Sequence, residues 1–315
     1  MKLLKIREKM QSIYAKYSKY IDFGTKFLLA VFTFFMIDQS IGTMEQLSNP
    51  MILLGASGLC AFFTPVVTVV VAMGMMLVHM VKVSIGCAAV MLVLLLVMFL
   101  LYCRFTPERA IIVLLMPLAF MLKVPYVIPI LCGLSLTPIS AIPVAFGTII
   151  HYSLVEFAGM TKELAESEDL MGHITLFFKE IVQNKELWIM AAAFTVSVTV
   201  VYLMKRLAIS YAREIAILAG TIVHIVVILF VGNVFKTSIS AVGVIGGNVA
   251  AFIIAYLIYT LFFAADYRRI ETIQYEDDDY YYYVKAVPKK KSTLPTEPFV
   301  QEVPEVEEKK EEIIN

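Results

Sequence analysis

Charged residues are scarce in this chain: they make up 17% of its 315 residues, whereas apolar residues make up 60%. The mean hydropathy is +0.81. A soluble domain needs more polar surface than this composition supplies. Between Phe23 and Ala264 the apolar runs are long enough to cross a bilayer, which takes about 20 residues in a helix. The sequence therefore predicts an all-α polytopic helix bundle embedded in a membrane.

Motifs for catalysis and cofactor binding are also lacking. The sequence has no Gly-rich phosphate loop, no His-Glu-x-x-His zinc motif and no ATP-binding domain. Its four cysteines lie inside apolar runs without a Cys-x-x-Cys pair, which favours a packing role. We predict no catalytic residue, cofactor or metal site, and no enzyme. Transport against a gradient would then need an ion gradient or a separate ATPase subunit.

Positive and negative charges are distributed unevenly along the chain. The tail from Asp266 to Asn315 holds 13 acidic and 8 basic residues, so the other residues hold 13 acidic and 18 basic ones. An apolar body with a positive surplus is typical of a membrane protein. Nucleic acid is not an expected partner.

Three regions follow from this distribution. Residues 1–22 form a basic segment, which the positive-inside rule places in the cytoplasm. Residues 23–264 form the transmembrane domain. Residues 265–315 form an acidic, Tyr-rich tail with several prolines, which we expect to be disordered. Because Arg268 and Arg269 follow the last span, we predict a multi-pass protein of the cell membrane with both termini in the cytoplasm.

One segment within the transmembrane domain is less apolar. Residues 156–186 carry several acids, and the neighbouring charges place the segment on the extracytoplasmic side. Leu170, Ile174, Phe177 and Ile181 are spaced so that they share one helical face. We expect an amphipathic helix that lies on the outer surface or caps the bundle.

The number of membrane segments depends on two apolar stretches that proline interrupts. Clear spans are predicted at residues 23–41, 86–103, 107–122, 187–204, 215–231 and 241–264. Residues 51–80 are interrupted at Thr64-Pro65, and residues 125–150 at Pro129, Pro138 and Pro143. Proline removes a backbone donor and clashes with the preceding turn. Kinked helices give eight spans, whereas two hairpins give about ten transmembrane or re-entrant segments.

A spacing of 73 residues recurs along the chain. It relates Gly74, Gly147 and Gly220, and likewise Gly86, Gly159 and Gly232. The same offset relates Thr64-Pro65 to Thr137-Pro138, and His151 to His224. A tandem repeat of this kind is common in transporter folds. The alternative is that the background similarity of apolar helices produces the match.

The broken segments are where we expect a binding site. Interrupted helices expose helix ends and free carbonyls, which can hold an ion or a polar solute. The alternative is a structural kink filled by neighbouring helices. The candidate solute-pathway residues are Thr64, Pro65, Thr137, Pro138 and His224. His224 is included because an ionisable ring in the middle of a span faces the bundle interior, although it can also serve only to bond a neighbouring helix.

The tail contains a run of acids and tyrosines. Asp277, Asp278 and Asp279 are followed by Tyr280, Tyr281, Tyr282 and Tyr283. Tyrosine favours extended structure, and the acids would be repelled by an anionic cytoplasmic leaflet. We therefore expect this stretch to dock on a cytoplasmic protein by adding a strand, rather than to rest its tyrosines at the membrane interface.

A short motif suggests a different class of protein. Gly55-Ala-Ser-Gly58 resembles the Gly-x-Ser-Gly signature of rhomboid intramembrane proteases. The resemblance implies that Ser57 is a nucleophile activated by a histidine from another helix. It covers four residues, and no later histidine stands in the family's His-x-x-Gly context. The alternative is that Ser57 is a small residue that lets helices approach.

Three functions follow from these observations. The favoured one is a transporter or permease-like subunit of unknown substrate, because of the interrupted segments and their repeat. The second is a non-catalytic membrane scaffold that recruits cytoplasmic partners through the tail. The remote third is the intramembrane serine protease.

Overall fold

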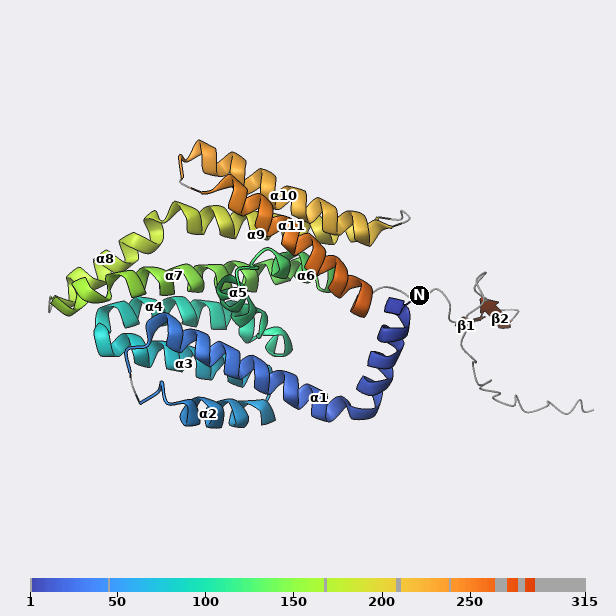
Figure 1. Cartoon of the computed structure of the whole chain (residues 1–315), viewed down its shortest axis with the longest axis horizontal. Helices are drawn as coiled ribbons and strands as arrows, with labels where there is room; N and C mark the ends of the chain where they lie inside the picture. The colour runs from blue at the N-terminus through green and yellow to red at the C-terminus, as the bar shows by residue number, and fades with distance from the viewer. Residues whose placement is uncertain are drawn as a thin grey trace, which may run out of the picture. The chain divides into compact units, whose positions relative to one another are not determined.

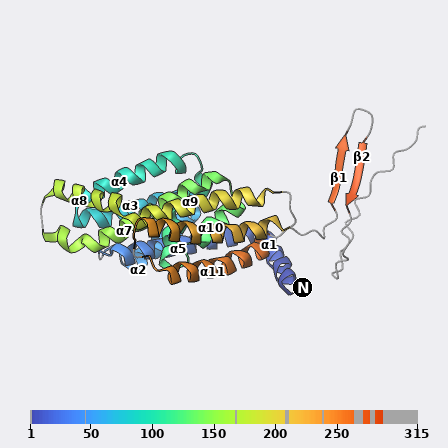
Figure 2. The same cartoon turned by 90° about the horizontal axis from the view of Figure 1, so that it is seen from above.

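The computed structural model describes residues 2–44, 46–166, 169–207, 211–237, 239–263, 271–276 and 281–286. The chain divides into two units, Met1–Phe263 and Ala264–Asn315. The first is a helix bundle in which most long helices run along a common direction (Figure 1; Figure 2). The predicted all-α polytopic membrane bundle is confirmed for this unit.

Seven helical stretches among the described residues are long and apolar enough to cross a membrane. They are α1 (Lys2–Ile41), α3 (Pro65–Val83), α4 (Ile85–Met98) with the π-helical turn η1 (Phe99–Cys103), the 3₁₀ turn η3 (Pro138–Ser140) with α7 (Ala141–Glu166), α9 (Lys185–Lys205), α10 (Ala212–Val234), and α11 (Ala241–Ile258) with the π-helical turn η4 (Tyr259–Phe263). The first of these bends at Tyr17, where the backbone leaves the helical region.

Three further apolar helices are too short to cross. They are α2 (Pro50–Phe62), α5 (Ile112–Met121) and α6 (Val127–Ser135). At about 1.5 Å per residue, α2 is about 20 Å long and the others about 15 Å, against about 30 Å of hydrocarbon. The prediction of a full span at residues 107–122 is therefore wrong. Pro107–Arg109 forms the 3₁₀ turn η2 instead, and α5 begins only at Ile112.

The break at Thr64-Pro65 reverses the direction of the chain. The side chain of Ser48, just before α2, bonds Asp38 near the end of α1. At the other end of α2, Lys26 on α1 donates to the carbonyl of Phe63 at 3.4 Å. These two contacts show that α2 runs antiparallel to α1.

The next helix, α3, returns in the direction of α1. It begins at Pro65, and His79 near its end accepts a hydrogen bond at its carbonyl from Thr43 Oγ1, at 2.7 Å. Since Thr43 follows the end of α1, the two helices are parallel. The Thr64-Pro65 break is therefore the turn of a hairpin, and not a kink in one long helix.

The helices α5 and α6 form a second kind of hairpin, which we call the half-depth hairpin (residues 112–135). A Cβ atom added to Gly147 of α7 would lie 2.6 Å from the carbonyl oxygen of Val113, and Phe120 stacks on His151, so α5 runs parallel to α7. Gly133 of α6 packs closely on α9, because a Cβ atom added to it would lie 2.9 Å from the carbonyl oxygen of Val198.

The turn of the half-depth hairpin lies midway along the length of the bundle. Tyr126, at the start of α6, contacts the ring of Phe194, in the middle of α9. Lys123 takes a left-handed backbone conformation, with φ of 59°, where the chain reverses. Since α6 then runs beside α9 as far as Lys205, it is antiparallel to α7. The break at Thr137-Pro138 is thus also a hairpin turn.

These directions divide the bundle into two ends. The Thr-Pro end contains Phe63–Thr64, Leu136–Thr137 and Lys205–Arg206, and Arg104 follows η1 there. The Glu186 end contains Thr43, Ser84, Asn184–Glu186 and Ser240. With seven long and three short apolar helices in the described chain, ten segments fit the hairpin interpretation rather than the eight-span one.

The helix α8 (Leu170–Gln183) caps the bundle at the Glu186 end. Phe177 and Ile181 are buried, and the helix packs on α4 and α7. The ring of His173 contacts Ser84 Oγ at 2.9 Å, at the start of α4. The structure thus favours the capping form of the predicted amphipathic helix.

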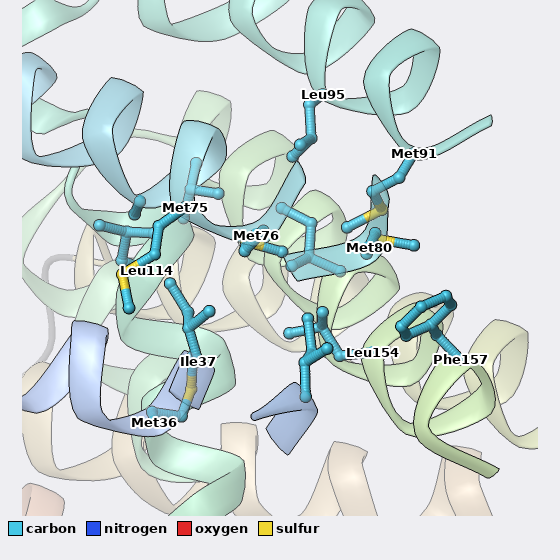
Figure 3. Packing of buried hydrophobic residues seen from close by; sticks show 14 of the residues in the cluster. Met36, Ile37, Met75, Met76, Met80, Met91, Leu95, Leu114, Leu154 and Phe157 are labelled. Atoms are coloured by element: carbon cyan, nitrogen blue, oxygen red, sulfur yellow. The ribbon is translucent and has the colours of Figure 1, made fainter. Parts of the chain in front are cut away.

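Methionine supplies much of the buried packing between α1, α3 and α4. Met80 and Met91 face one another across α3 and α4, and Met36 of α1 lies beside Ile37 in the same buried cluster (Figure 3). The flexible, polarisable side chain of methionine fills irregular gaps between helices. A second cluster, around Phe194 and Ile228, packs α5, α6 and α7 against α9, α10 and α11.

The 73-residue spacing corresponds to helix starts more closely than to glycine packing. Pro65 and Pro138 begin helical stretches at that offset, and α10 begins within one residue of the third position. At Gly147 and Gly220 an added Cβ would lie within 2.6 Å of neighbouring atoms, but at Gly74 it would meet nothing within 4 Å. The glycines are therefore not equivalent in packing.

The second unit contains a two-stranded antiparallel sheet, β1 (Glu271–Glu276) and β2 (Tyr281–Ala286). Glu276 pairs with Tyr281 and Tyr275 with Tyr282. The tail that we predict to be disordered, residues 265–315, thus contains these two strands, and the disorder of the rest stays a prediction. The other residues of that segment, including Asp277, Asp278, Asp279 and Tyr280, lie outside the described chain.

Candidate functional site

The two Thr-Pro breaks lie on separate hairpins at the Thr-Pro end. Thr64 and Thr137 are exposed, and Pro65 and Pro138 are half-buried. The residues predicted to form one pathway are therefore not brought together with His224, which lies in the middle of α10.

Lysine side chains bond the carbonyls that these breaks release. Lys205 Nζ donates to the carbonyls of Leu134 and Leu136 at 2.9 and 2.7 Å, at the end of α6. Lys26 does the same at Phe63, at the end of α2. The sequence predicts carbonyls free to hold a solute, but at each break an ammonium group bonds at least one of them.

His224 is fully buried and has one hydrogen-bond partner. Its Nδ1 lies 3.2 Å from Asn248 Oδ1 on α11, and Asn248 Nδ2 donates to the carbonyl of Val244. Because that bond orients the amide, Oδ1 accepts and Nδ1 carries the proton. Nε2 of His224 is buried without a hydrogen-bond partner.

The ring of His224 belongs to an aromatic cluster in the middle of the bundle. Phe194 lies 5.4 Å from it and Tyr126 lies 5.7 Å from it, between ring centroids. Phe120 links this group to His151, on which it stacks at 4.2 Å. The aromatic cluster consists of Phe120, Tyr126, His151, Tyr152, Phe194 and His224. The two histidines related by the 73-residue offset thus lie in one cluster.

A pocket of about 290 Å³ lies between this cluster and the Glu186 end. Tyr126 and Tyr152 form its inner part, while Glu186, at the start of α9, and Ser240, which caps α11, lie at its mouth. We call it the Glu186 pocket; its lining residues are Tyr126, Tyr152, Glu186, Met190, Ile239, Ser240, Gly243 and Val244. Glu186 is the one charged residue among them.

The last helix approaches the half-depth hairpin closely beside this pocket. A Cβ atom on Gly247 would lie 2.7 Å from Cε2 of Tyr126, so only glycine fits here without displacing the ring. Ala251, one turn further along α11, is fully buried. The small residues of α11 thus form a seam within the molecule and position Tyr126 in the pocket.

A larger open pocket lies at the same end. It has a volume of about 580 Å³ and lies where α8 caps α3, α4 and α7, with Lys82, Ser84 and His173 among its lining residues. Ser84 Oγ also caps α4 by accepting from the backbone of Cys87. We regard its polar groups as the join between α8 and the bundle, since none of them reaches the half-depth hairpin.

The structure gives Ser57 a local role. Its side chain is fully buried in α2, and its hydroxyl donates to the carbonyl of Leu53, one turn earlier, at 2.7 Å. This is the ordinary back-bond of a helical serine. Within the described residues, no histidine bonds Ser57, and no group of three His, Cys, Asp or Glu side chains is arranged to hold a metal ion.

Sequence reasoning identified His224 but missed the residues that line the pocket. Tyr126, Tyr152 and Glu186 come from three separate segments and share no motif. The sequence feature that could have identified the two tyrosines is their position within apolar runs, because a phenol in the middle of a membrane needs a polar neighbour. Comparison with protein-family models, curated proteins and solved structures found no match to this chain.

Proposed function

We propose that this integral membrane protein is a permease-like transport subunit, and that its solute enters through the Glu186 pocket. The observation that carries the proposal is the position of the pocket above the half-depth hairpin. In transporters, helices interrupted near the middle of the bilayer line the solute site, because irregular backbone is tolerated in lipid only where protein or a water-filled cavity surrounds it.

The pocket lining favours neutral polar or cationic solutes. Glu186 is its only charge, and the two phenols offer both hydroxyl groups and the electron-rich faces of their rings. His224 lies behind Tyr126 with an unpaired ring nitrogen. In this scheme the aromatic cluster closes the route to the Thr-Pro end, and solute passes only when the cluster rearranges.

The charges at the two ends support an orientation. Lys205 and Arg206 lie at the Thr-Pro end, where Arg104 and Arg109 also lie, whereas Glu156 and Glu186 lie at the other. By the positive-inside rule the Thr-Pro end is cytoplasmic. Both termini are then cytoplasmic, and the pocket opens outward. The energy source is an ion gradient or a separate ATPase subunit.

The test is permeation into proteoliposomes that contain the full chain. Glycerol, glycine and methylammonium chloride serve as probes, and their entry is followed by vesicle swelling. We expect Met190→Trp, which places an indole in the pocket, to reduce entry to the protein-free rate. Glu186→Gln is expected to slow methylammonium more than glycerol, because it removes the only charge in the lining.

Two variants outside the pocket act as controls. Leu203→Trp adds the same indole to an exposed position of α9, and Glu180→Gln removes a charge from α8 at the same end. Both should leave entry unchanged. Equal rates for Met190→Trp and Leu203→Trp, with both proteins folded, would count decisively against a pathway through this pocket.

The scaffold function stays a second candidate because of the strands in the tail. A two-stranded sheet has two outer edges that can accept a further strand. Tyr281, Tyr282 and Tyr283 lie on β2, next to the acids at residues 277–279. If the scaffold function holds, a chain ending at Phe263 loses specific partner capture from cytoplasm. Under the transport proposal the same truncation leaves permeation intact.

A further inference from the structure

An apolar groove lies on the flank of the half-depth hairpin, away from the Glu186 pocket. It has a volume of about 510 Å³ and is bounded by α5, α6 and the last turns of α11 with η4. Its lining residues are Ile112, Leu115, Ile128, Leu131, Cys132, Ser135, Leu136, Ile258 and Phe262. The single hydroxyl, on Ser135, already donates to the carbonyl of Leu131 at 2.6 Å.

The groove has the length of one bilayer leaflet. On α6 it extends from Ile128, near the hairpin turn, to Leu136 at the Thr-Pro end. Eight residues of helix rise about 12 Å, and half of the hydrocarbon thickness is about 15 Å. A groove of this depth and composition fits an extended hydrocarbon chain that enters from the Thr-Pro end.

Positive charge lies at the end of the groove where a lipid headgroup would sit. Leu136 lines the groove, and its carbonyl accepts from Lys205 Nζ at 2.7 Å. The ammonium bonds the carbonyls of Leu134 and Leu136 and also lies 4.7 Å from the centroid of the Tyr202 ring, so its charge is held at this end of the groove. The neighbouring Arg206 is exposed and bonds the hydroxyl of Tyr202 at 3.3 Å. Basic groups between membrane helices attract the headgroups of acidic lipids.

We propose that this groove binds one acyl chain of an anionic phospholipid from the leaflet at the Thr-Pro end, with the headgroup at Lys205 and Arg206. The apolar lining holds the chain, and the two cations select the charge of the headgroup. The lipid fills the space between the half-depth hairpin and α11. These two elements contact each other directly through α6 more than through α5.

The test measures which lipid the purified full chain retains. The protein is reconstituted in equal amounts of phosphatidylglycerol and phosphatidylcholine, extracted into mild detergent, and examined by native mass spectrometry. We expect one phosphatidylglycerol per chain to be retained preferentially. Arg206→Gln should reduce the preference about fivefold, the factor expected for one cation at a membrane surface.

Groove-filling variants separate this site from general lipid binding. Leu131→Trp on α6 and Leu115→Trp on α5 each place an indole in the groove from one of its walls. Both leucines are only half-buried, so each single variant should still fold. Both should lose the retained lipid, whereas Leu203→Trp, on the exposed face of α9, should keep it. Equal retention of the two lipids by the natural chain would overturn the proposal. So would phosphatidylglycerol retained by both groove variants, or a second copy of the chain found in place of the lipid.

Discussion

At the scale of single residues, three glycines related by the 73-residue offset provide a matched test of packing. An added methyl group on Gly147 would lie 2.6 Å from the carbonyl oxygen of Val113, whose backbone cannot easily move. On Gly220 it would lie 2.4 Å from a methyl group of Val201, and on Gly74 it would meet open space. The sequence treats the three as equivalent, but their surroundings differ.

We therefore expect Gly147→Ala and Gly220→Ala to lower the free energy of unfolding by about 1–3 kcal/mol each. Gly74→Ala should be neutral or slightly stabilising, because alanine is the better helix former. Thermal unfolding in detergent measures all three. A Gly74→Ala variant as unstable as Gly147→Ala would mean that the 73-residue positions share one packing role after all.

The lysines at the helix breaks give a second prediction at this scale. Lys205 makes two short bonds to carbonyls at the end of α6, whereas Lys26 makes one at 3.4 Å. Lys205→Met should lower the free energy of unfolding by about 1.5–3 kcal/mol, the usual value for hydrogen bonds to charged groups. Lys26→Met should cost less than about 1 kcal/mol, since its bond is long. Equal shifts in the unfolding temperature would contradict a capping role for Lys205.

These residues also show why the sequence could locate the breaks but not their partners. The chemistry of Pro65 and Pro138 is local, so an interruption follows from the residue type alone. Which group satisfies the released carbonyls depends on Lys205, which lies 69 residues after Leu136 and reaches it only because α6 packs beside α9. We interpreted the freed carbonyls as solute ligands because no local signal indicated the lysine.

At the scale of elements, apolar composition predicted membrane segments better than it predicted their lengths. Residues 107–122 are almost continuously apolar, yet the first of them form the turn η2 and α5 has only ten residues. Hydropathy measures whether a segment is stable in lipid, not whether it crosses. The half-depth hairpin, and with it the Glu186 pocket, depends on contacts of α5 with α7 and of α6 with α9, which are distant in sequence.

The join between α4 and α8 makes a prediction at this scale. Ser84 Oγ caps α4 and contacts His173 of α8 at 2.9 Å, in a buried position. Ser84→Ala should lower the free energy of unfolding by about 1–2 kcal/mol and expose α8 to proteolysis, because it removes a helix cap and leaves the His173 contact unmade. Ser240→Ala removes a more exposed cap from α11 and should cost less. Unchanged protease resistance in Ser84→Ala would argue against this join.

At the scale of the whole molecule, the hairpin topology makes a prediction that does not depend on which side is cytoplasmic. If α2 and α3 form a hairpin, Lys82 lies on the same side of the membrane as Lys185, and Arg104 lies on the other side. One kinked helix over residues 51–80 would instead place Lys82 opposite Lys185. The four native cysteines are buried, so replacing them with alanine gives a background for labelling.

Single cysteines at these three exposed positions are then treated with a membrane-impermeant maleimide, before and after the membrane is made permeable. We expect Lys82→Cys and Lys185→Cys to react under the same condition, and Arg104→Cys under the other. By the positive-inside rule, Arg104→Cys in intact cells should need permeabilisation. Labelling of Arg104→Cys together with Lys185→Cys, and not with Lys82→Cys, would show one kinked helix and exclude the hairpin. It would also remove the half-depth arrangement on which the Glu186 pocket depends, because the direction of every helix between α3 and α7 follows from that first turn.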